Sequence, residues 1–159
     1  MGQFTADKKQ NGGETMVVLN GHIDEDAQFS SLDLGGCEKI MVDLAGVTAI
    51  NSCGIREWIK WIRTAPATAG VTYKNCPKVI VDQINMVSGF LPENGKVESF
   101  YVPYYCDSTG NEKMILFKEG VEFKNNEVFP PAVIKDDETG EEMEMDVIQA
   151  KYFKFLNKG

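Results

Sequence analysis

The pattern of hydrophobic and polar positions predicts alternating strands and helices over residues 16–105. Two apolar, β-branched runs at 16–23 and 39–44 have the composition of strands in a covered sheet, and the second suits a strand buried between two layers. From Cys53 the spacing changes, because apolar residues recur at i, i+3, i+4 and i+7 and charged residues fill the other face. This pattern predicts an amphipathic helix that ends before Pro66. Its apolar residues are Ile55, Trp58, Ile59 and Ile62.

The same alternation continues beyond this helix. A strand is predicted at 71–75 and an aromatic-rich strand at 97–105. The helix between them has Pro77 in its first turn and ends at Gly89. Strands that alternate with helices are typical of a mainly parallel sheet with right-handed crossovers. We therefore expect a mixed, mainly parallel α/β domain, in which the amphipathic helix packs its apolar face on the strand at 39–44.

The segments outside this pattern are expected to be shorter or flexible. Residues 24–32 suit a short helix capped by Asp24. Residues 1–14 are polar, with little to bury, and are predicted to be a flexible lead-in. No helical period of useful length follows the main domain at 15–105, so we assign 106–159 to a small antiparallel β appendage. Its short extended segments lie at 114–117, 121–123, 129–134, 143–147 and 152–156.

Composition and charge narrow the class of protein. A chain of 159 residues with 43% hydrophobic content can bury one core with a small satellite, but not two full-sized domains. Its net charge of −8 opposes binding to nucleic acid or to an anionic membrane surface. No apolar run approaches the roughly 20 residues that span a bilayer, and residues 1–10 lack the apolar core of a signal peptide. We therefore predict a cytoplasmic protein with neither nucleic acid nor membrane as a partner.

The four cysteines are predicted to be small, mostly buried hydrophobic residues in a reducing compartment. They are far apart and form neither a C-x-x-C pair nor a disulfide-dense pattern. They are Cys37, Cys53, Cys76 and Cys106.

The candidate site lies where the second strand leads into the amphipathic helix. In open α/β sheets the functional crevice lies beyond the carboxyl ends of strands, and residues 45–52 are predicted to be the loop at that place. Ser52 is the predicted N-cap, beside free backbone N–H groups and the positive end of the helix dipole. A phosphate there would be stabilised, with Asn51, Cys53 and Gly54 completing a binding loop. The plainer interpretation is that Ser52 is only a cap and Asn51 only a turn residue.

The residues on both sides of this loop resemble a known family. Residues 42–55 read V-D-L-A-G-V-T-A-I-N-S-C-G-I. This is similar to the STAS family pattern, in which a strand with D-L-S-G-V leads through D-S-S-G-L into a helix. Residues 19–24 read L-N-G-H-I-D, similar to the family's L-x-G-x-L-D strand end. The similarity covers residues 16–105 and implies a STAS-like fold and a bacterial signalling protein of the anti-sigma-factor-antagonist type.

The resemblance also implies a role for Ser52. In anti-sigma-factor antagonists the first serine of D-S-S-G is phosphorylated by a partner kinase that doubles as an anti-sigma factor, and Ser52 matches that serine. Asn51 stands where the family has an acidic residue, and Cys53 replaces the second serine. Many STAS-like domains lack the switch and serve only as docking modules. The implied partner is a protein, either an anti-sigma-type serine kinase or a larger signalling assembly, with or without phosphorylation of Ser52.

An interaction module is favoured over an enzyme. The single histidine, His22, lies beside the apolar run of the first strand, where a structural role is expected. Cys53 as a nucleophile would need His22 as its base, and G-x-S-x-G, P-loop and G-x-G-x-x-G motifs are absent. Trp61, at the margin of the apolar stripe, is either an interface anchor or a cover for the seam between sheet and helix. The alternative function is a small-molecule or nucleotide-binding domain that uses the loop at 45–52 without a phosphorylation switch.

Two short segments of the appendage have matching sequences. Residues 106–110 read C-D-S-T-G and residues 136–140 read D-D-E-T-G. They resemble the C-x-x-C-G knuckles of a zinc ribbon, but only Cys106 occupies one of the four thiol positions. We predict an eroded ribbon that binds no metal, with two ordinary glycine turns as the alternative. The acidic stretch at 136–146 lacks the residue order of a calcium loop and is predicted to be a solvated hairpin. No cofactor is predicted.

Overall fold

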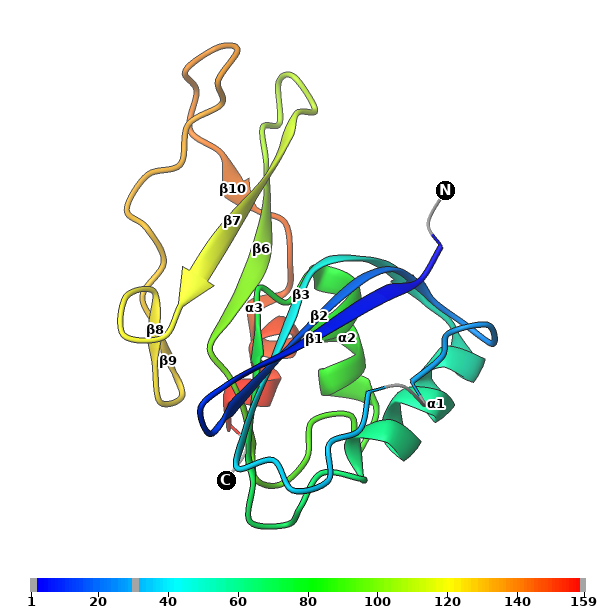
Figure 1. The fold of residues 1–159 in the computed structure, drawn as a ribbon. Coiled ribbons are helices and arrows are strands. Elements are labelled where there is room, and N and C mark those ends of the chain that lie inside the picture. Colours follow the sequence, from blue (N-terminus) through cyan, green and yellow to red (C-terminus); the bar gives the residue numbers. More distant parts are fainter. Residues whose placement is uncertain (1–2, 30–31, 158–159) are drawn as a thin grey trace.

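The computed structural model describes residues 3–29 and 32–157, and these residues form three sheets (Figure 1). The largest sheet has five strands in the spatial order of the sequence. Its strands β2 to β5 run parallel to one another, and β1 lies antiparallel to β2 at one edge. The five strands are β1 (Thr5–Asn11), β2 (Glu14–Ile23), β3 (Lys39–Ile50), β4 (Gly70–Lys74) and β5 (Gly95–Val97).

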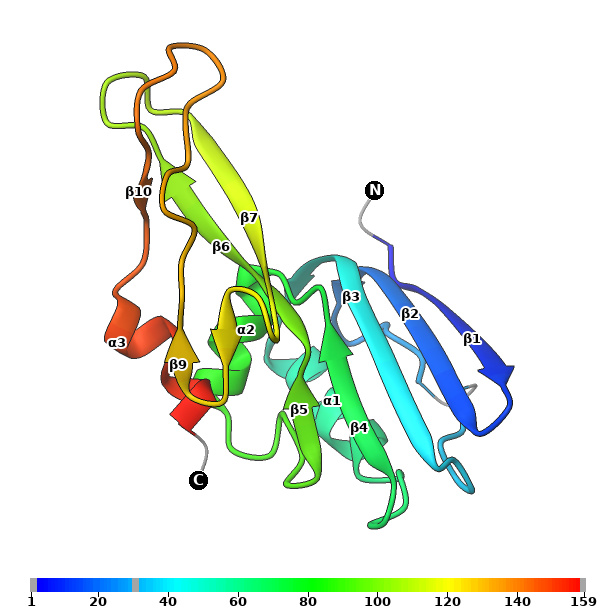
Figure 2. The ribbon, with the colours of Figure 1, turned by 90° about the vertical axis from the view of Figure 1, so that its left-hand side faces the viewer.

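Two helices connect the parallel strands and lie on the same face of this sheet (Figures 1 and 2). They are α1 (Ser52–Ile62), between β3 and β4, and α2 (Lys78–Met86), between β4 and β5. Pro77 is the N-cap of α2, with extended backbone. The predicted order β-α-β-α-β and the mainly parallel α/β class are therefore confirmed.

Only one face of the sheet is covered by these helices. Alternate positions along β2 and β3 are buried, as expected when one face of a strand packs on the core. Met41 and Asp43, which point to the opposite face of β3, are partly exposed. The expectation that this strand is buried between two layers was therefore wrong. Met41 makes the run at 39–44 look apolar on both faces, but the face that carries Met41 and Asp43 is only partly covered.

The appendage is a second, antiparallel unit. Its three-stranded sheet has β6 (Ser99–Tyr105) between β7 (Glu112–Lys118) and β10 (Glu144–Met145). A small hairpin follows, made of β8 (Phe123–Lys124) and β9 (Glu127–Val128). The last described elements are helix α3 (Gln149–Tyr152) and the 3₁₀ helix η1 (Lys154–Asn157).

Three local predictions near the start of the chain were wrong. In the expected flexible lead-in at 1–14, Thr5–Asn11 form strand β1, while residues 1 and 2 lie outside the described residues. In the expected helix at 24–32, the Asp24 carboxylate accepts a hydrogen bond from the Asp26 N–H at 2.9 Å, within a turn. Residues 30 and 31 of that segment lie outside the described residues. The segment expected to be a loop, 45–52, is mostly strand, because β3 continues to Ile50.

The boundary between domain and appendage also differs from the predicted one. The single strand expected at 97–105 is divided at Glu98 into β5, in the parallel sheet, and β6, in the appendage sheet. The appendage sheet therefore begins before residue 106. Residues 129–134 contain no strand, and residues 152–156 are mainly helical rather than extended.

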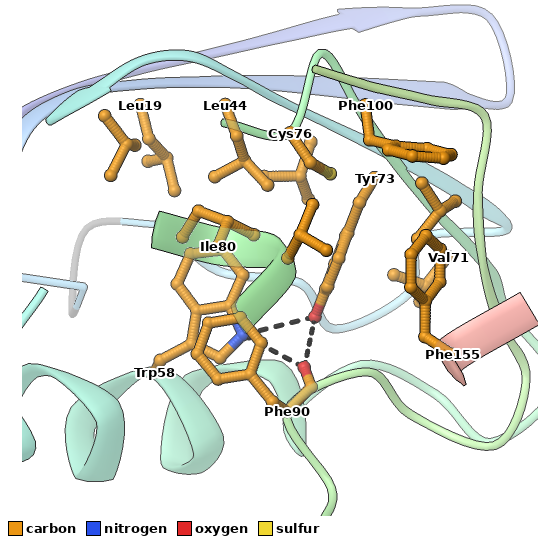
Figure 3. Packing of buried hydrophobic residues seen from close by; sticks show 14 of the residues in the cluster. Leu19, Leu44, Trp58, Val71, Tyr73, Cys76, Ile80, Phe90, Phe100 and Phe155 are labelled. Carbon is orange, nitrogen blue, oxygen red and sulfur yellow. Dashed lines mark hydrogen bonds between the residues drawn. The ribbon is translucent and has the colours of Figure 1, made fainter. Parts of the chain in front are cut away.

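Trp58 of α1 lies at the centre of the main core (Figure 3). Its indole N–H lies 3.2 Å from both the Tyr73 hydroxyl and the Phe90 carbonyl, and the Tyr73 hydroxyl donates to the same carbonyl at 2.6 Å. These bonds satisfy polar groups whose burial would otherwise destabilise the fold. Ile62 is buried as predicted, whereas Ile55 and Ile59 are only partly buried at the edge of the helix contact.

Phe100 of β6 connects the appendage to the same core. Its ring centroid lies 5.1 to 6.2 Å from five other aromatic centroids of the appendage. Cys76, which follows β4, forms a parallel bridge with Phe100 and is fully buried. The two sheets therefore share one continuous hydrophobic cluster. The five aromatic neighbours are Phe117, Phe123, Tyr152, Phe153 and Phe155.

Candidate functional site

The candidate site is the junction between β3 and α1, which consists of a single residue, Asn51. Its backbone N–H donates to the carbonyl of Ile23 at 3.1 Å, which attaches the junction to the end of β2. Strand β3 pairs with β2 as far as Ile50, with irregularities in the register along the way. The site is therefore the end of a paired strand rather than a crevice loop.

Asn51, and not Ser52, is the N-cap of α1. Its backbone is extended, with φ −109° and ψ 179°, and its side-chain oxygen accepts a hydrogen bond from the Gly54 N–H at 2.8 Å. The side-chain amide donates to the Glu25 carboxylate at 3.0 Å. This hydrogen bond lowers the pKa of Glu25. Glu25 is a site residue that sequence reasoning missed, although the acidic run after the first strand contains it.

Gly54 allows α1 to begin directly against β2. A Cβ atom at this position would overlap the backbone carbonyl of Ile23. Gly54 is itself buried in this contact. Glycine is therefore needed at this position of the N-S-C-G segment for steric reasons, which do not depend on any ligand.

Ser52 is the first residue of α1 and is exposed. Within the described part of the chain, its hydroxyl has no hydrogen-bond partner. The N–H groups of a first helical turn have no intrahelical acceptor, and no acidic side chain occupies this turn of α1. An anion attached at Ser52 would therefore meet the positive end of the helix dipole. Cys53, beside it, is a free thiol of intermediate exposure.

Trp61 is not an exposed anchor, so its predicted role as an interface residue was wrong. It is only 4% exposed, and its indole N–H donates to the Leu32 carbonyl at 2.8 Å. Its ring stacks on Phe29, with centroids 4.9 Å apart. Trp61 thus covers the seam between α1 and the segment after β2. The other interpretation of the sequence had placed it over the seam between sheet and helix.

His22 lies exposed on β2, between the buried residues Gly21 and Ile23, and so points away from the face that α1 covers. The described residues include no hydrogen bond between Cys53 and His22. Cys37, Cys76 and Cys106 are buried free thiols, as predicted.

The two matching turns of the appendage lie against each other. In each turn the glycine has positive φ, +73° at Gly110 and +74° at Gly140. Each glycine N–H donates at 2.8 Å to the carbonyl four residues earlier, that of Cys106 and that of Asp136 respectively. The backbone conformations of the two turns therefore match as closely as their sequences do.

The Asp136 carboxylate is the centre of the contact between these turns. It is 4% exposed and accepts hydrogen bonds from Thr109 at 3.0 Å, Thr139 at 3.1 Å and Asn111 at 3.1 Å. Burial raises the pKa of Asp136, but the hydrogen bonds from Asn111, Thr109, the Glu138 N–H and Thr139 together lower it to about 2. We call this group the Asp136 clasp, defined by Asp136, Thr109, Asn111 and Thr139.

Cys106 lies at the edge of the clasp. Its sulfur is 3.4 Å from the Ser108 hydroxyl and 3.8 Å from the Glu141 carboxylate. Among the described residues, no group of three or more His, Cys, Asp or Glu side chains is arranged to hold a metal ion.

Comparisons with known proteins find no similarity in sequence and a similarity in structure. No protein-family model matches the chain, and no curated protein matches it in sequence. Among solved structures, the chain is similar to an anti-sigma factor antagonist from Mycobacterium paratuberculosis, with a TM-score of 0.41 and 17% sequence identity. That match covers 48% of this chain and 71% of the other. Within the described ranges, no helix is long and apolar enough to cross a membrane.

Proposed function

We propose that this protein is a non-enzymatic, STAS-like interaction module of the anti-sigma-factor-antagonist type, switched by phosphorylation of Ser52. The supporting observation is an exposed serine hydroxyl at the first residue of α1, directly after a capped and sterically fixed junction. The resemblance of residues 42–55 to the family pattern assigns the phospho-acceptor to the same serine. The proposed partner is a serine kinase of the anti-sigma type or a larger signalling assembly. Free thiols at all four cysteines support a cytoplasmic location.

The chemistry of the junction supports a change in binding rather than in folding. A phosphate adds about −1.5 to −2 charges at neutral pH. The neighbouring residues Asn51, Cys53 and Gly54 are uncharged, so the phosphate would dominate the local field. Asn51 is held by hydrogen bonds to Gly54 and Glu25, neither of which involves Ser52. The helix dipole would stabilise the added charge without any rearrangement of the backbone.

The test is to compare partner binding and thermal stability in the same variants. Partners are first recovered with the parent protein from an extract of its native cells. We expect Ser52→Asp, and enzymatic phosphorylation of Ser52, to change the affinity for a recovered partner about tenfold or more, which corresponds to roughly 1.4 kcal/mol. The melting temperature should stay within about 2 °C of the parent value.

The matched control is Ser88→Asp, which adds the same charge at an exposed serine after α2. It should leave partner binding unchanged. If Ser52→Ala and Ser52→Asp both bind every recovered partner as the parent does, Ser52 is only the first residue of a helix. A nucleotide that saturates the α1 start in titrations would instead favour the small-molecule alternative.

We also propose that the appendage is a ribbon-like unit held by hydrogen bonds instead of zinc. In a C-x-x-C-G knuckle pair the four ligand positions correspond to Cys106, Thr109, Asp136 and Thr139 of this chain. The hydrogen bonds from Thr109 and Thr139 to Asp136 support this interpretation, since they join three of the four positions.

A further inference from the structure

The solvent-facing side of α1 carries a row of positive charges, the basic stripe, defined by Arg56, Lys60 and Arg63. At about 100° per residue, these three side chains and Ser52 project within about 80° of one another. All four are exposed. The opposite side of the helix is formed by its buried residues, which are Gly54, Trp58, Trp61 and Ile62.

The basic stripe is a local exception on an acidic protein. The chain has a net charge of −8, yet both of its arginines, Arg56 and Arg63, lie in this one stripe. Lys60 pairs with Glu57 at 3.6 Å, whereas the structure gives neither arginine an ion pair with a described residue. Like charges one turn apart destabilise a helix, so the stripe weakens α1 in the absence of a partner. Arginine is also the cation best suited to paired hydrogen bonds with carboxylates.

An apolar margin borders the stripe. Ile55 and Ile59 project next to Ser52 on the side away from Lys60, and both are only partly buried. We propose that the basic stripe and this margin together bind an acidic, amphipathic helical segment of a partner protein. A nucleic acid extends beyond the stripe, so its other phosphates would be repelled by the negative field of the rest of the molecule. A short peptide segment would contact the stripe alone.

The experiment measures binding of a defined probe to the full chain. The probe is a synthetic helical peptide labelled for fluorescence anisotropy. It has glutamates on one face, to meet the basic stripe, and leucines beside them, to meet Ile55 and Ile59. We expect it to bind the parent and to shift the backbone amide resonances of residues 52–63. The double variant R56Q/R63Q should weaken binding about tenfold, because two ion pairs are lost. The same peptide with lysines in place of glutamates should not bind.

The matched control is K118Q/K124Q, which makes the same change in net charge at exposed lysines of β7 and β8. It should bind the glutamate peptide within about twofold of the parent. The proposal is overturned if R56Q/R63Q binds like the parent or if K118Q/K124Q loses as much affinity. Equally tight binding of a single-stranded oligonucleotide to the stripe would overturn the assignment to a protein partner.

Discussion

At the scale of single residues, the start of α1 is determined by close contact with β2. Gly54 lies so near the carbonyl of Ile23 that no side chain fits between them. Asn51 completes the contact by donating its backbone N–H to the same carbonyl and by capping Gly54. The position of Ser52 on the surface follows from these two neighbours.

Replacing Gly54 with alanine should therefore destabilise the protein. Overpacking of a filled site typically costs about 1–3 kcal/mol, and here the obstacle is backbone. We expect Gly54→Ala to lower the free energy of unfolding by about that amount in urea titrations. Gly70→Ala is the control, because a Cβ at Gly70 meets no atom within 4 Å. Equal stability of the two variants would mean that α1 does not approach β2 as described.

The sequence identified the junction but not the role of each residue within it. Asparagine and serine are equally good N-caps, so composition could not choose between Asn51 and Ser52. The choice depends on where β3 ends, which its pairing with β2 decides. Trp61 was ambiguous for a similar reason. Its burial depends on Phe29 and Leu32, which are far from it in sequence.

At the scale of structural elements, two turns hold one end of the appendage together. Thr109 and Asn111 come from the turn between β6 and β7, whereas Asp136 and Thr139 come from the turn before β10. Charged groups surround the clasp from both turns and from β7. Glu138 accepts a hydrogen bond from Asn111, Asp137 pairs with Lys113, and Glu141 accepts from Ser108.

The Asp136 clasp should make the stability of the protein fall at low pH. The pKa of Asp136 is lowered to about 2 in the folded state, below its value of about 3.9 in an unfolded chain. Its contribution is therefore fully present above pH 4 or so and is lost as the pH falls towards 2. We expect Asp136→Asn to be less stable than the parent at neutral pH, and to lose less stability on acidification, in urea titrations at several pH values.

Asp137→Asn is the control for this prediction, since the Asp137 side chain is 89% exposed. It should follow the pH dependence of the parent. The clasp is expected to hold the turns without metal, so elemental analysis that finds about one zinc per chain would contradict it.

The sequence predicted the alternating strands and helices of the main domain because their hydrophobic spacing is regular. It missed β1, whose residues are exposed except for the partly buried Lys8, because a strand that buries nothing leaves no hydrophobic pattern. It also missed α3 and η1, where Tyr152, Phe153 and Phe155 are packed around Phe100. A cluster of three aromatic residues in four positions suits a strand by composition, and only the tertiary contact makes it helical.

At the scale of the whole molecule, the appendage and the main domain should unfold together. Phe100 contributes to both, and removing a buried phenylalanine side chain costs about 3–5 kcal/mol. We expect Phe100→Ala to shift a single urea transition to lower concentration. Tryptophan fluorescence, which reports on α1 alone, and far-ultraviolet circular dichroism should give the same midpoint.

Phe129→Ala serves as the comparison, because Phe129 is 51% exposed. It should change stability by no more than about 0.5 kcal/mol. Two separate transitions in Phe100→Ala, with the fluorescence transition unmoved, would show instead that the appendage is an independent unit.

Strand β1 has a consequence for how this protein behaves at high concentration. An unprotected edge strand is a template on which other chains add, and such addition leads to aggregation. Without β1, the outermost strand would be β2, whose Val17, Val18 and Leu19 make it a strongly aggregating edge. β1 covers that edge with a polar strand that carries Lys8 and Lys9. The polar strand β1 thus prevents strands of other chains from pairing with the hydrophobic edge of the sheet.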